Sequence, residues 1–219
     1  VTVAKGTIVT LAVKCDISSS VSDGTTFSWG VASGDTISGT GIDSGTSVDA
    51  SDNSNAGPTM TVTGAGSLTV TLDSSSPSYA LAAAGTSDVT LGVLKLTATN
   101  EDIRLDRMGL QLSNTSASSS ASDLMTVGLY DGSTMVGQAV FSGSSRNATT
   151  TLTETVIVPK DGTKVLTVKA TMSDNGASKP GTQGSLVQVD FDGDDSTATK
   201  GVGLDSGTTV YATGADTAV

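Results

Sequence analysis

The chain has 219 residues, a formal net charge of −11 at pH 7 and no histidine, and only 3% of its residues are aromatic. The negative charge argues against nucleic acid or an anionic membrane surface as the main partner. The lack of histidine removes the side chain that most often moves protons or binds metals near neutral pH.

Alternating apolar residues predict β-strands from the first residues onward. We expect strands at Val1–Val3 and Val9–Ile17, joined by a tight turn at Ala4–Thr7, because every second residue in them is apolar. Cys15 belongs to this alternation, so its thiol is expected to point into the core as an inert group. The alternation in Thr25–Val31 predicts a further strand.

Two longer alternating stretches follow a glycine pair at Gly64–Gly66, which we interpret as the joint between two domains. Val89–Ala98 predicts a long strand, and Ile103–Leu112 predicts another. Each pattern slips by one residue partway along, the first at Val93-Leu94. Such a slip moves the following side chains to the other face of a sheet and therefore predicts a β-bulge.

The clearest hairpin is predicted by two alternating stretches on either side of Asp131-Gly132. Leu124–Tyr130 and Ser133–Phe141 form its arms, and the Asp-Gly dipeptide readily takes the positive φ that a short hairpin turn needs. No stretch carries the periodicity of an amphipathic helix. The prediction for the whole chain is therefore all-β.

A stretch late in the chain repeats the N-terminal one. Val156–Ser173, VIVPKDGTKVLTVKATMS, matches Val1–Ser18, VTVAKGTIVTLAVKCDIS, and Gly201–Val210 matches Gly39–Val48. A sequence match between two long stretches so far apart in the chain indicates tandem copies of one domain. The matched positions include Val1 and Val156, Leu11 and Leu166, Cys15 and Ala170, and Trp29 and Phe191. Because both members of the last pair are large aromatics, Trp29 is expected to be a core anchor.

The repeat predicts how the chain is divided. Residues 1–64 are expected to be a partial repeat, the trailing half of a β-sandwich, and residues 65–219 a complete β-sandwich repeat. A partial repeat suggests that the chain belongs to something longer or that a partner completes it. The fold class we predict is an immunoglobulin-like antiparallel β-sandwich, in about one and a half tandem repeats, with a barrel as the open alternative.

The densest acidic cluster follows a predicted strand that contains Phe191. Alternation places Asp190 and Asp192 on the face opposite Phe191, and Asp194 and Asp195 in the next loop. Such loops often supply carboxylate ligands to Ca²⁺. The four aspartates are therefore a candidate calcium site, and a solvated acidic loop is the alternative.

Smaller acidic groups have simpler interpretations. Asn100, Glu101 and Asp102 beside Asp106 could hold a cation, although such groups more often cap turns. Asp43-Ser44-Gly45 recurs as Asp205-Ser206-Gly207. A side-chain acceptor before a glycine turn explains this recurrence without a ligand.

The sequence gives no support for an enzyme. Without histidine a nucleophile–base triad of the usual kind cannot form, and no catalytic residue or cofactor-binding residue is predicted. Asn114 and Asn147 fit the N-glycosylation sequon in stretches expected to be exposed loops.

Three stretches carry a resemblance to a known kind of module: Val158–Ser173, Ala98–Asn114 (ATNEDIRLDRMGLQLSN) and Val127–Phe141 (VGLYDGSTMVGQAVF). They resemble the Ser/Thr-rich tandem β-sandwich repeats of large prokaryotic surface proteins, of the S-layer, extracellular filament and adhesin type. The resemblance covers most of the chain and lies in composition and strand order. It implies an extracellular, structural and often multimeric role, in which Ca²⁺ is common but not obligatory.

The expected function is therefore a non-enzymatic structural module of an extracellular assembly, which in one version is completed by β-strand exchange with its neighbours. The expected partners are copies of the same protein, with no nucleic acid and no membrane span. The alternatives are a spacer or ligand-binding repeat of a cell-surface adhesin, which would engage a glycan or a host receptor, and an accessory domain of a secreted hydrolase. Only three tyrosines offer an aromatic surface to a glycan: Tyr79, Tyr130 and Tyr211.

Overall fold

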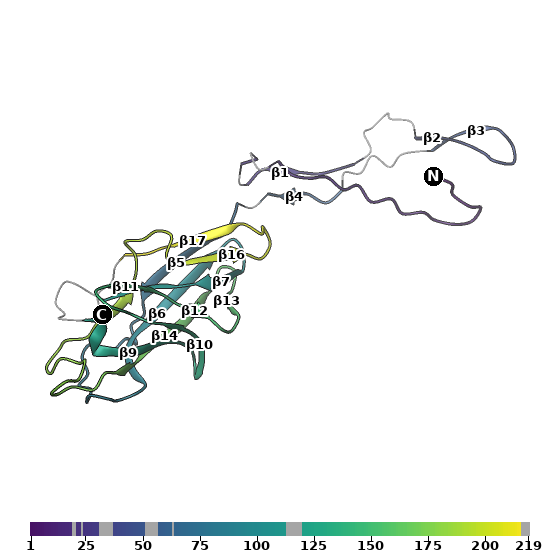
Figure 1. The fold of residues 1–219 in the computed structure, drawn as a ribbon. Helices are drawn as coiled ribbons and strands as arrows, with labels where there is room; N and C mark the ends of the chain where they lie inside the picture. The colour runs from purple at the N-terminus through teal and green to yellow at the C-terminus, as the bar shows by residue number, and fades with distance from the viewer. Residues whose placement is uncertain are drawn as a thin grey trace. The chain divides into compact units, whose positions relative to one another are not determined.

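The structure is a computed structural model that describes residues 1–18, 21–22, 24–30, 37–50, 57–62, 64–112 and 120–215. The chain divides into two units, Val1–Gly64 and Ala65–Val219. Within the described residues, regular structure consists of β-strands and one turn of 3-10 helix, η1 (Ala121–Asp123) (Figure 1). The all-β fold predicted from the alternating apolar residues is confirmed.

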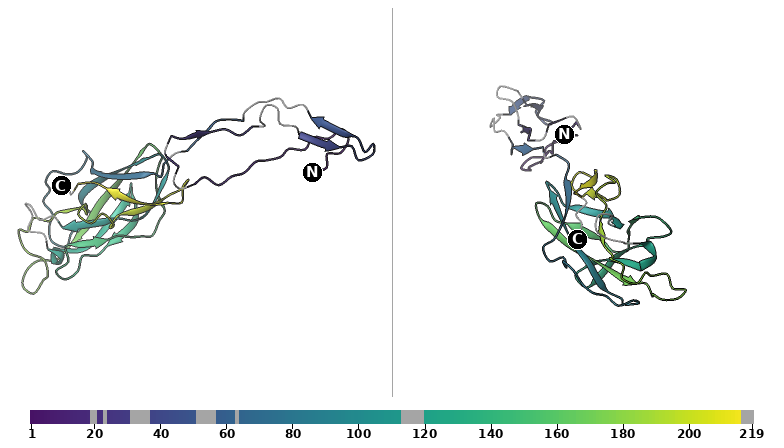
Figure 2. Two further views of the ribbon diagram at one scale, coloured as in Figure 1. Left: turned by 90° about the horizontal axis from the view of Figure 1, so that it is seen from above. Right: turned by 90° about the vertical axis from the view of Figure 1, so that its left-hand side faces the viewer.

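The second unit is built on one ten-stranded sheet, seen from three directions in Figure 1 and Figure 2. Neighbouring strands are antiparallel except for one parallel pair, β17 and β5, which departs from the antiparallel prediction. The two edge strands, β12 and β13, are linked in the chain by residues 153–155 alone, so the sheet curls back toward itself. In spatial order the strands are β12 (Thr151–Leu152), β10 (Thr134–Ala139), β9 (Leu124–Asp131), β14 (Thr163–Met172), β6 (Val89–Thr99), β5 (Ser67–Leu72), β17 (Thr209–Thr213), β16 (Lys200–Gly203), β7 (Ile103–Arg107) and β13 (Val156–Val158).

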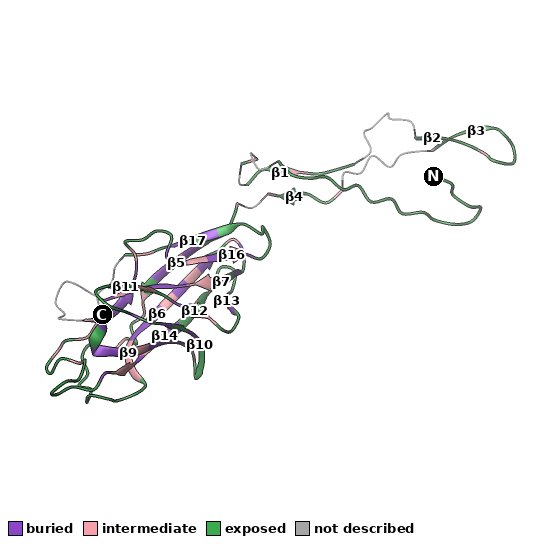
Figure 3. Cartoon of the chain, viewed as in Figure 1, coloured by how far each residue is buried: buried purple, intermediate pink, exposed green. Residues whose placement is uncertain are grey.

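A second, three-stranded antiparallel sheet consists of β11 (Asn147–Thr149), β8 (Gly109–Leu112) and β15 (Val189–Phe191). Apolar side chains from both sheets form one buried cluster in this unit (Figure 3). Burying alternate residues of facing sheets is the main source of stability in such a fold. The most deeply buried large side chains include Leu68, Leu94, Leu96, Ile103, Met108, Leu110, Leu129, Leu166 and Phe191.

Both predicted slips have a structural counterpart. The second lies in β7, where Lys200 pairs with Arg107 but the next residue, Gly201, pairs with Leu105, so that Asp106 is the extra residue of a bulge. After this bulge the chain passes Met108 and enters the three-stranded sheet. The bulge therefore marks where the chain changes sheets.

The first slip lies slightly earlier than predicted, at Leu91 in β6, which the pairing with β14 skips. Val93 and Leu94 are both buried, although consecutive residues of a strand face opposite ways. The turn Asp73–Ser76 continues the pairing along the edge of β6 at Val93, where the pairing with β5 ends at Leu94. The backbone N–H of Asp73 and the hydroxyl of Ser76 both donate to the Val93 carbonyl.

The predicted hairpin is confirmed as β9 and β10. Asp131 pairs with Thr134, which leaves Gly132 and Ser133 as a two-residue loop. Gly132 has a φ of 60°, at the first loop position, where a type II′ turn requires glycine. The positive φ therefore falls on the glycine of the Asp-Gly pair.

The first unit contains two short strand pairs, β1 (Thr26–Phe27) with β4 (Met60–Thr61), and β2 (Ile37–Thr40) with β3 (Ser47–Ala50). No residue whose burial is described in this unit is buried (Figure 3). The strands predicted at Val1–Val3 and Val9–Ile17 do not form.

The prediction that Cys15 is a core thiol is wrong for this chain, because Cys15 is exposed. Its counterpart in the second unit, Ala170, is buried in β14. There, β14 lies between β6 and β9, and both of these strands come from the segment of which the chain holds one copy. An alternating sequence needs such neighbours before it can form and bury a strand.

Trp29 is likewise not a core anchor here, with 51% of its surface exposed against 2% for Phe191. Phe191 pairs with Leu110 of β8 in the small sheet. Trp29 instead follows β1, and its carbonyl accepts a hydrogen bond from the Gly57 amide, 2.6 Å away. The predicted strand at Thr25–Val31 is thus reduced, within the described residues, to Thr26–Phe27.

Candidate functional sites

The predicted calcium ligands lie at and beyond the end of β15, where the chain leaves the small sheet. Asp190 and Asp192 are both buried, and Phe191 between them is buried as well, so both faces of this strand are covered. Asp192 accepts a hydrogen bond of 2.8 Å from the side-chain amide of Asn147 and one of 3.2 Å from the backbone N–H of Asp195. Its carboxylate therefore ties the end of β15 to β11 and to its own loop.

Asp194 and Asp195 lie in an exposed loop, as expected. The Asp195 carboxylate accepts bonds from the hydroxyl and the backbone N–H of Thr197, at 2.7 and 2.8 Å. These two bonds, the hydroxyl first, lower the pKa of Asp195 below its ordinary value. In the described part of the chain, no three His, Cys, Asp or Glu side chains gather in a way that could hold a metal ion. Calcium at this segment stays a prediction.

The two sequon asparagines have different outcomes. Asn114 lies outside the described residues. Asn147 is exposed, but it is the first residue of β11, where it pairs with Gln111, and it does not lie in a loop as predicted. Its side-chain nitrogen, the atom to which a glycan would attach, donates the bond to Asp192. Glycosylation of Asn147 stays a prediction.

A buried carboxylate with four hydrogen bonds belongs to Glu101, in the turn between β6 and β7. This residue is only 2% exposed, and its two oxygens accept four hydrogen bonds. The donors are the N–H of Gly66 at 2.7 Å, the N–H of Asp205 at 2.9 Å, the N–H of Ser206 at 2.8 Å and the Ser206 hydroxyl at 2.7 Å. Burial alone raises the pKa of Glu101, but the four bonds outweigh it and lower the pKa below its ordinary 4.5.

The residues beside Glu101 reach a second turn. Asp102 accepts a bond of 2.6 Å from the backbone N–H of Lys160, in the turn between β13 and β14. The backbone N–H of Asn100 donates to the Asp161 carboxylate in the same turn, at 3.1 Å. The acidic turn Asn100–Asp102 therefore joins two turns that are both distant in the sequence. It acts as a cap, which agrees with the simpler of the two interpretations of this group.

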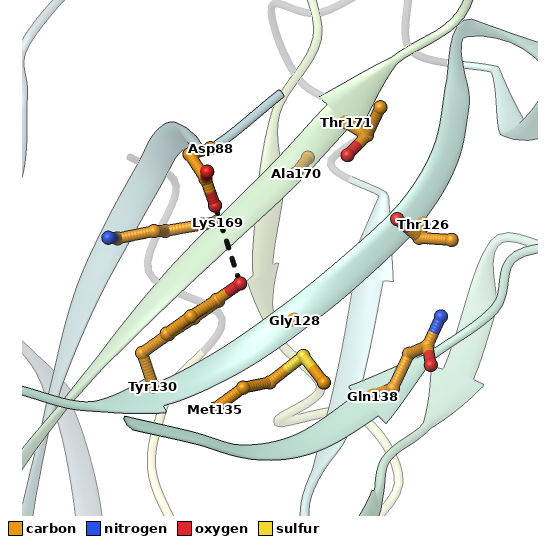
Figure 4. Close-up of a pocket in the computed structure, with 9 residues that line it drawn as sticks. All are labelled: Asp88, Thr126, Gly128, Tyr130, Met135, Gln138, Lys169, Ala170 and Thr171. Carbon is orange, nitrogen blue, oxygen red and sulfur yellow. Dashed lines mark hydrogen bonds between the residues drawn. The ribbon is translucent and has the colours of Figure 1, made fainter. Parts of the chain in front are cut away.

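A depression of about 250 Å³ lies on one face of the large sheet, over β9, β10 and β14 (Figure 4). The Tyr130 hydroxyl donates a bond of 3.4 Å to Asp88, and the Lys169 ammonium lies 4.7 Å from the centre of the Tyr130 ring. Burial first, and then the charge of Asp88, raise the pKa of Tyr130. A Cβ atom on Gly128 would lie 2.7 Å from the Tyr130 ring, so the glycine makes room for it. These contacts hold Tyr130 against the sheet and leave it less available as a platform for a sugar.

A larger groove of about 710 Å³ lies between residues 77–84 and 181–188. Tyr79, Leu81 and Leu186 line it and are at least half exposed. The sequence analysis did not identify this groove, because the Ala-rich stretch around Tyr79 has no strand or helix periodicity. The only sequence signal was the isolated pair of large apolar residues, Tyr79 and Leu81, in that stretch.

No family model matches the chain, and neither a curated protein nor a solved structure matches it. Within the described residues, none of the helical structure is long and apolar enough to span a membrane.

Proposed function

We propose that the chain is a non-enzymatic structural module of an extracellular assembly, such as an S-layer, sheath or filament, built from tandem immunoglobulin-like β-sandwich repeats. The observation that carries this proposal is that the repeated sequence also repeats in local structure. β2 and β3 pair in the same register as β16 and β17: Gly39 faces Val48, as Gly201 faces Val210. A repeated local structure agrees with the resemblance to the tandem β-sandwich repeats of large prokaryotic surface proteins.

The chemistry of the described residues supports a structural role over a catalytic one. The chain has no histidine. The carboxylates of Asp73 and Asp195, whose pKa values are lowered, are held by donors of their own turns, and that of Glu101, also lowered, is held by donors of segments distant in the sequence. Carboxylates prepared for catalysis more often have pKa values raised toward neutrality. The partners that fit this role are further copies of the same protein, at the cell surface.

Labelling of native material tests the proposal. Antibodies against the chain, applied to intact cells of the source, should decorate an ordered layer or filament visible by electron microscopy. Labelling restricted to the cell interior, or a dispersed secreted protein with no ordered array, would contradict it.

The groove at Tyr79 favours one further candidate, a ligand-binding repeat of a cell-surface adhesin. An exposed aromatic ring beside an apolar groove is the usual platform for a sugar ring. A glycan array probed with the purified chain and with Tyr79→Ala separates the candidates. Binding lost in the variant would support the adhesin, and an array without hits would leave the structural module.

A further inference from the structure

The turn at Gly41–Thr46 in the first unit repeats the turn at Gly203–Thr208 in the second. The glycine at the left-handed position has a φ of 65° in the first turn and 67° in the second. The backbone bonds that close the turns also agree. They are Gly41 N–H to Thr46 C=O at 2.8 Å and Gly45 N–H to Gly41 C=O at 2.8 Å in the first, and Gly203 N–H to Thr208 C=O at 2.9 Å and Gly207 N–H to Gly203 C=O at 2.9 Å in the second.

The two turns differ in what they hold. In the second unit three donors of the turn, from Asp205 and Ser206, surround the carboxylate of Glu101. The same three donors exist in the first unit, on Asp43 and Ser44, and both residues are exposed. Among the described residues, no acceptor takes the place of Glu101 for them. The first turn is therefore a preformed carboxylate socket.

A second turn repeats in the same way. The N–H of Thr7 donates to the Ala4 carbonyl at 3.0 Å, as the N–H of Gly162 donates to the Pro159 carbonyl at 3.0 Å. In the second unit this turn offers the N–H of Lys160 to Asp102, the neighbour of Glu101. Lys5 is the matching residue in the first unit. Its N–H has no acceptor among the described residues, so the first unit presents both turns that the acidic turn Asn100–Asp102 caps.

The apolar residues of the first unit also lack the cover that their counterparts have in the second unit. The apolar residues that are buried in β13 and β14 are exposed at the matching positions of the first unit, and their burial in the second unit comes from strands of the segment 65–155. Leu11 is 70% exposed against 0% for Leu166, and Val48 is 57% exposed against 6% for Val210. A run of exposed alternating apolar residues marks an interaction surface. The second unit shows which strands cover the matching surface.

We propose that Val1–Ser18 and Gly39–Val48 of the first unit are a docking surface for a further copy of the half-repeat 65–155, and that a glutamate at the position of Glu101 in that copy enters the Asp43–Ser44 turn. This inference deepens the proposed function, from which it takes the tandem repeat, because it names the partner and the contact that selects it. In the docked state β6 and β9 of the added copy flank Val9–Ile17 on its two sides. The hydrogen bonds that Glu101 and Asp102 accept, including the one from Gly66 to Glu101, recur in the docked state. The bond from Asn100 to Asp161 is lost, because the first copy has Gly6 at the position of Asp161.

The test adds one half-repeat to the whole chain. A second copy of 65–155 is fused ahead of Val1, so that Thr155 of the added copy is followed by Val1, the counterpart of Val156. Cys15 and Trp29 are the only cysteine and tryptophan in the chain, and the added segment contains neither. Both therefore report on the first unit alone. We expect alkylation of Cys15 to slow by about tenfold or more relative to the parent chain, and Trp29 emission to shift to the blue.

A matched control changes only the carboxylate. Glu101→Gln in the added copy should restore much of the Cys15 reactivity, whereas Glu154→Gln in the same copy should not. Unchanged Cys15 and Trp29 signals in the fused chain would overturn the proposal. So would protection of Cys15 in the parent chain that rises with protein concentration, because the occupant would then be a second whole chain. The measurements use dilute purified protein, so a failure to label the cell surface would contradict the proposed function without affecting this result.

Discussion

The carboxylate of Glu101 accepts hydrogen bonds from both the backbone N–H and the hydroxyl of Ser206, at 2.8 and 2.7 Å, across 105 residues of chain. The charged acceptor is buried, so these bonds are stronger than neutral ones in water and are costly to break. The contact fixes the β16–β17 turn to the β6–β7 turn at one end of the large sheet.

Replacement of this carboxylate should destabilise the second unit. Glu101→Gln keeps the size of the side chain but removes its charge and one of its acceptors, so at least one buried donor loses its partner. We expect the free energy of unfolding to fall by about 2 kcal/mol, measured by urea denaturation. Glu154 is the other glutamate in the chain and is exposed, so Glu154→Gln is the matched control and should change little. Equal losses in the two variants would contradict the role of Glu101.

Lowering the pH should remove the stabilisation that the Glu101 carboxylate gives to the folded state. The folded-state pKa of Glu101 lies below its ordinary 4.5, so the unfolded chain binds a proton at a higher pH than the folded one. The stabilisation is therefore complete above pH 4.5 and is lost as pH falls through the lower folded pKa. We expect the stability difference between the parent chain and Glu101→Gln to shrink as the pH falls from about 6 to about 3. A difference that stays constant over this range would show that the carboxylate charge plays no part.

The calcium prediction for Asp190, Asp192, Asp194 and Asp195 has a direct thermal test. Calcium bound to the folded state alone, at about a hundred times its Kd, would stabilise the protein by about 2.7 kcal/mol and raise its Tm. The rise should disappear on chelation and in the Asp194→Asn, Asp195→Asn double variant, and it should be smaller with Mg²⁺. A Tm that does not change when calcium is added would support the alternative, a solvated acidic loop.

Cys15 gives the simplest check on the first unit. Because its thiol is exposed, it should react with a thiol reagent under native conditions at nearly the rate measured in urea. The reagent 5,5′-dithiobis(2-nitrobenzoic acid) reports this rate by absorbance. Strong protection in native buffer would mean that the first unit buries Val9–Ile17 without any partner.

The parts of the fold that the sequence predicted are those decided by neighbouring residues. The hairpin at Gly132 and the bulge at Asp106 depend on turn chemistry and on side-chain alternation, and both could be identified from short stretches. The first slip was predicted at Val93-Leu94 but lies at Leu91, where β6 changes register against β14, a partner strand distant in the sequence. Local patterns cannot contain that information.

The errors at Cys15 and Trp29 have one physical origin. The alternation that predicts a buried strand is shared by Leu11–Ile17 and β14, but burial depends on β6 and β9, which only the second unit provides. Glu101 was grouped with its acidic neighbours as a turn cap, but the residues that donate hydrogen bonds to it were not predicted. The recurrence of Asp-Ser-Gly was explained by a side-chain acceptor, and the Ser44 and Ser206 hydroxyls do accept from the residues two places on. The carboxylate that the second of these turns also holds could not be foreseen from spacing.

The one parallel pair in the large sheet has a mechanical consequence. β5 is the first strand of the second unit and β17 is the last that the structure describes, and they lie side by side, with Leu68 opposite Ala212 and Thr69 opposite Thr213. Tension that pulls β5 by its leading end and β17 by its trailing end drives two parallel neighbours past each other. The hydrogen bonds between them are then loaded in shear and share the force, whereas a hairpin pulled open from its ends loses them one at a time.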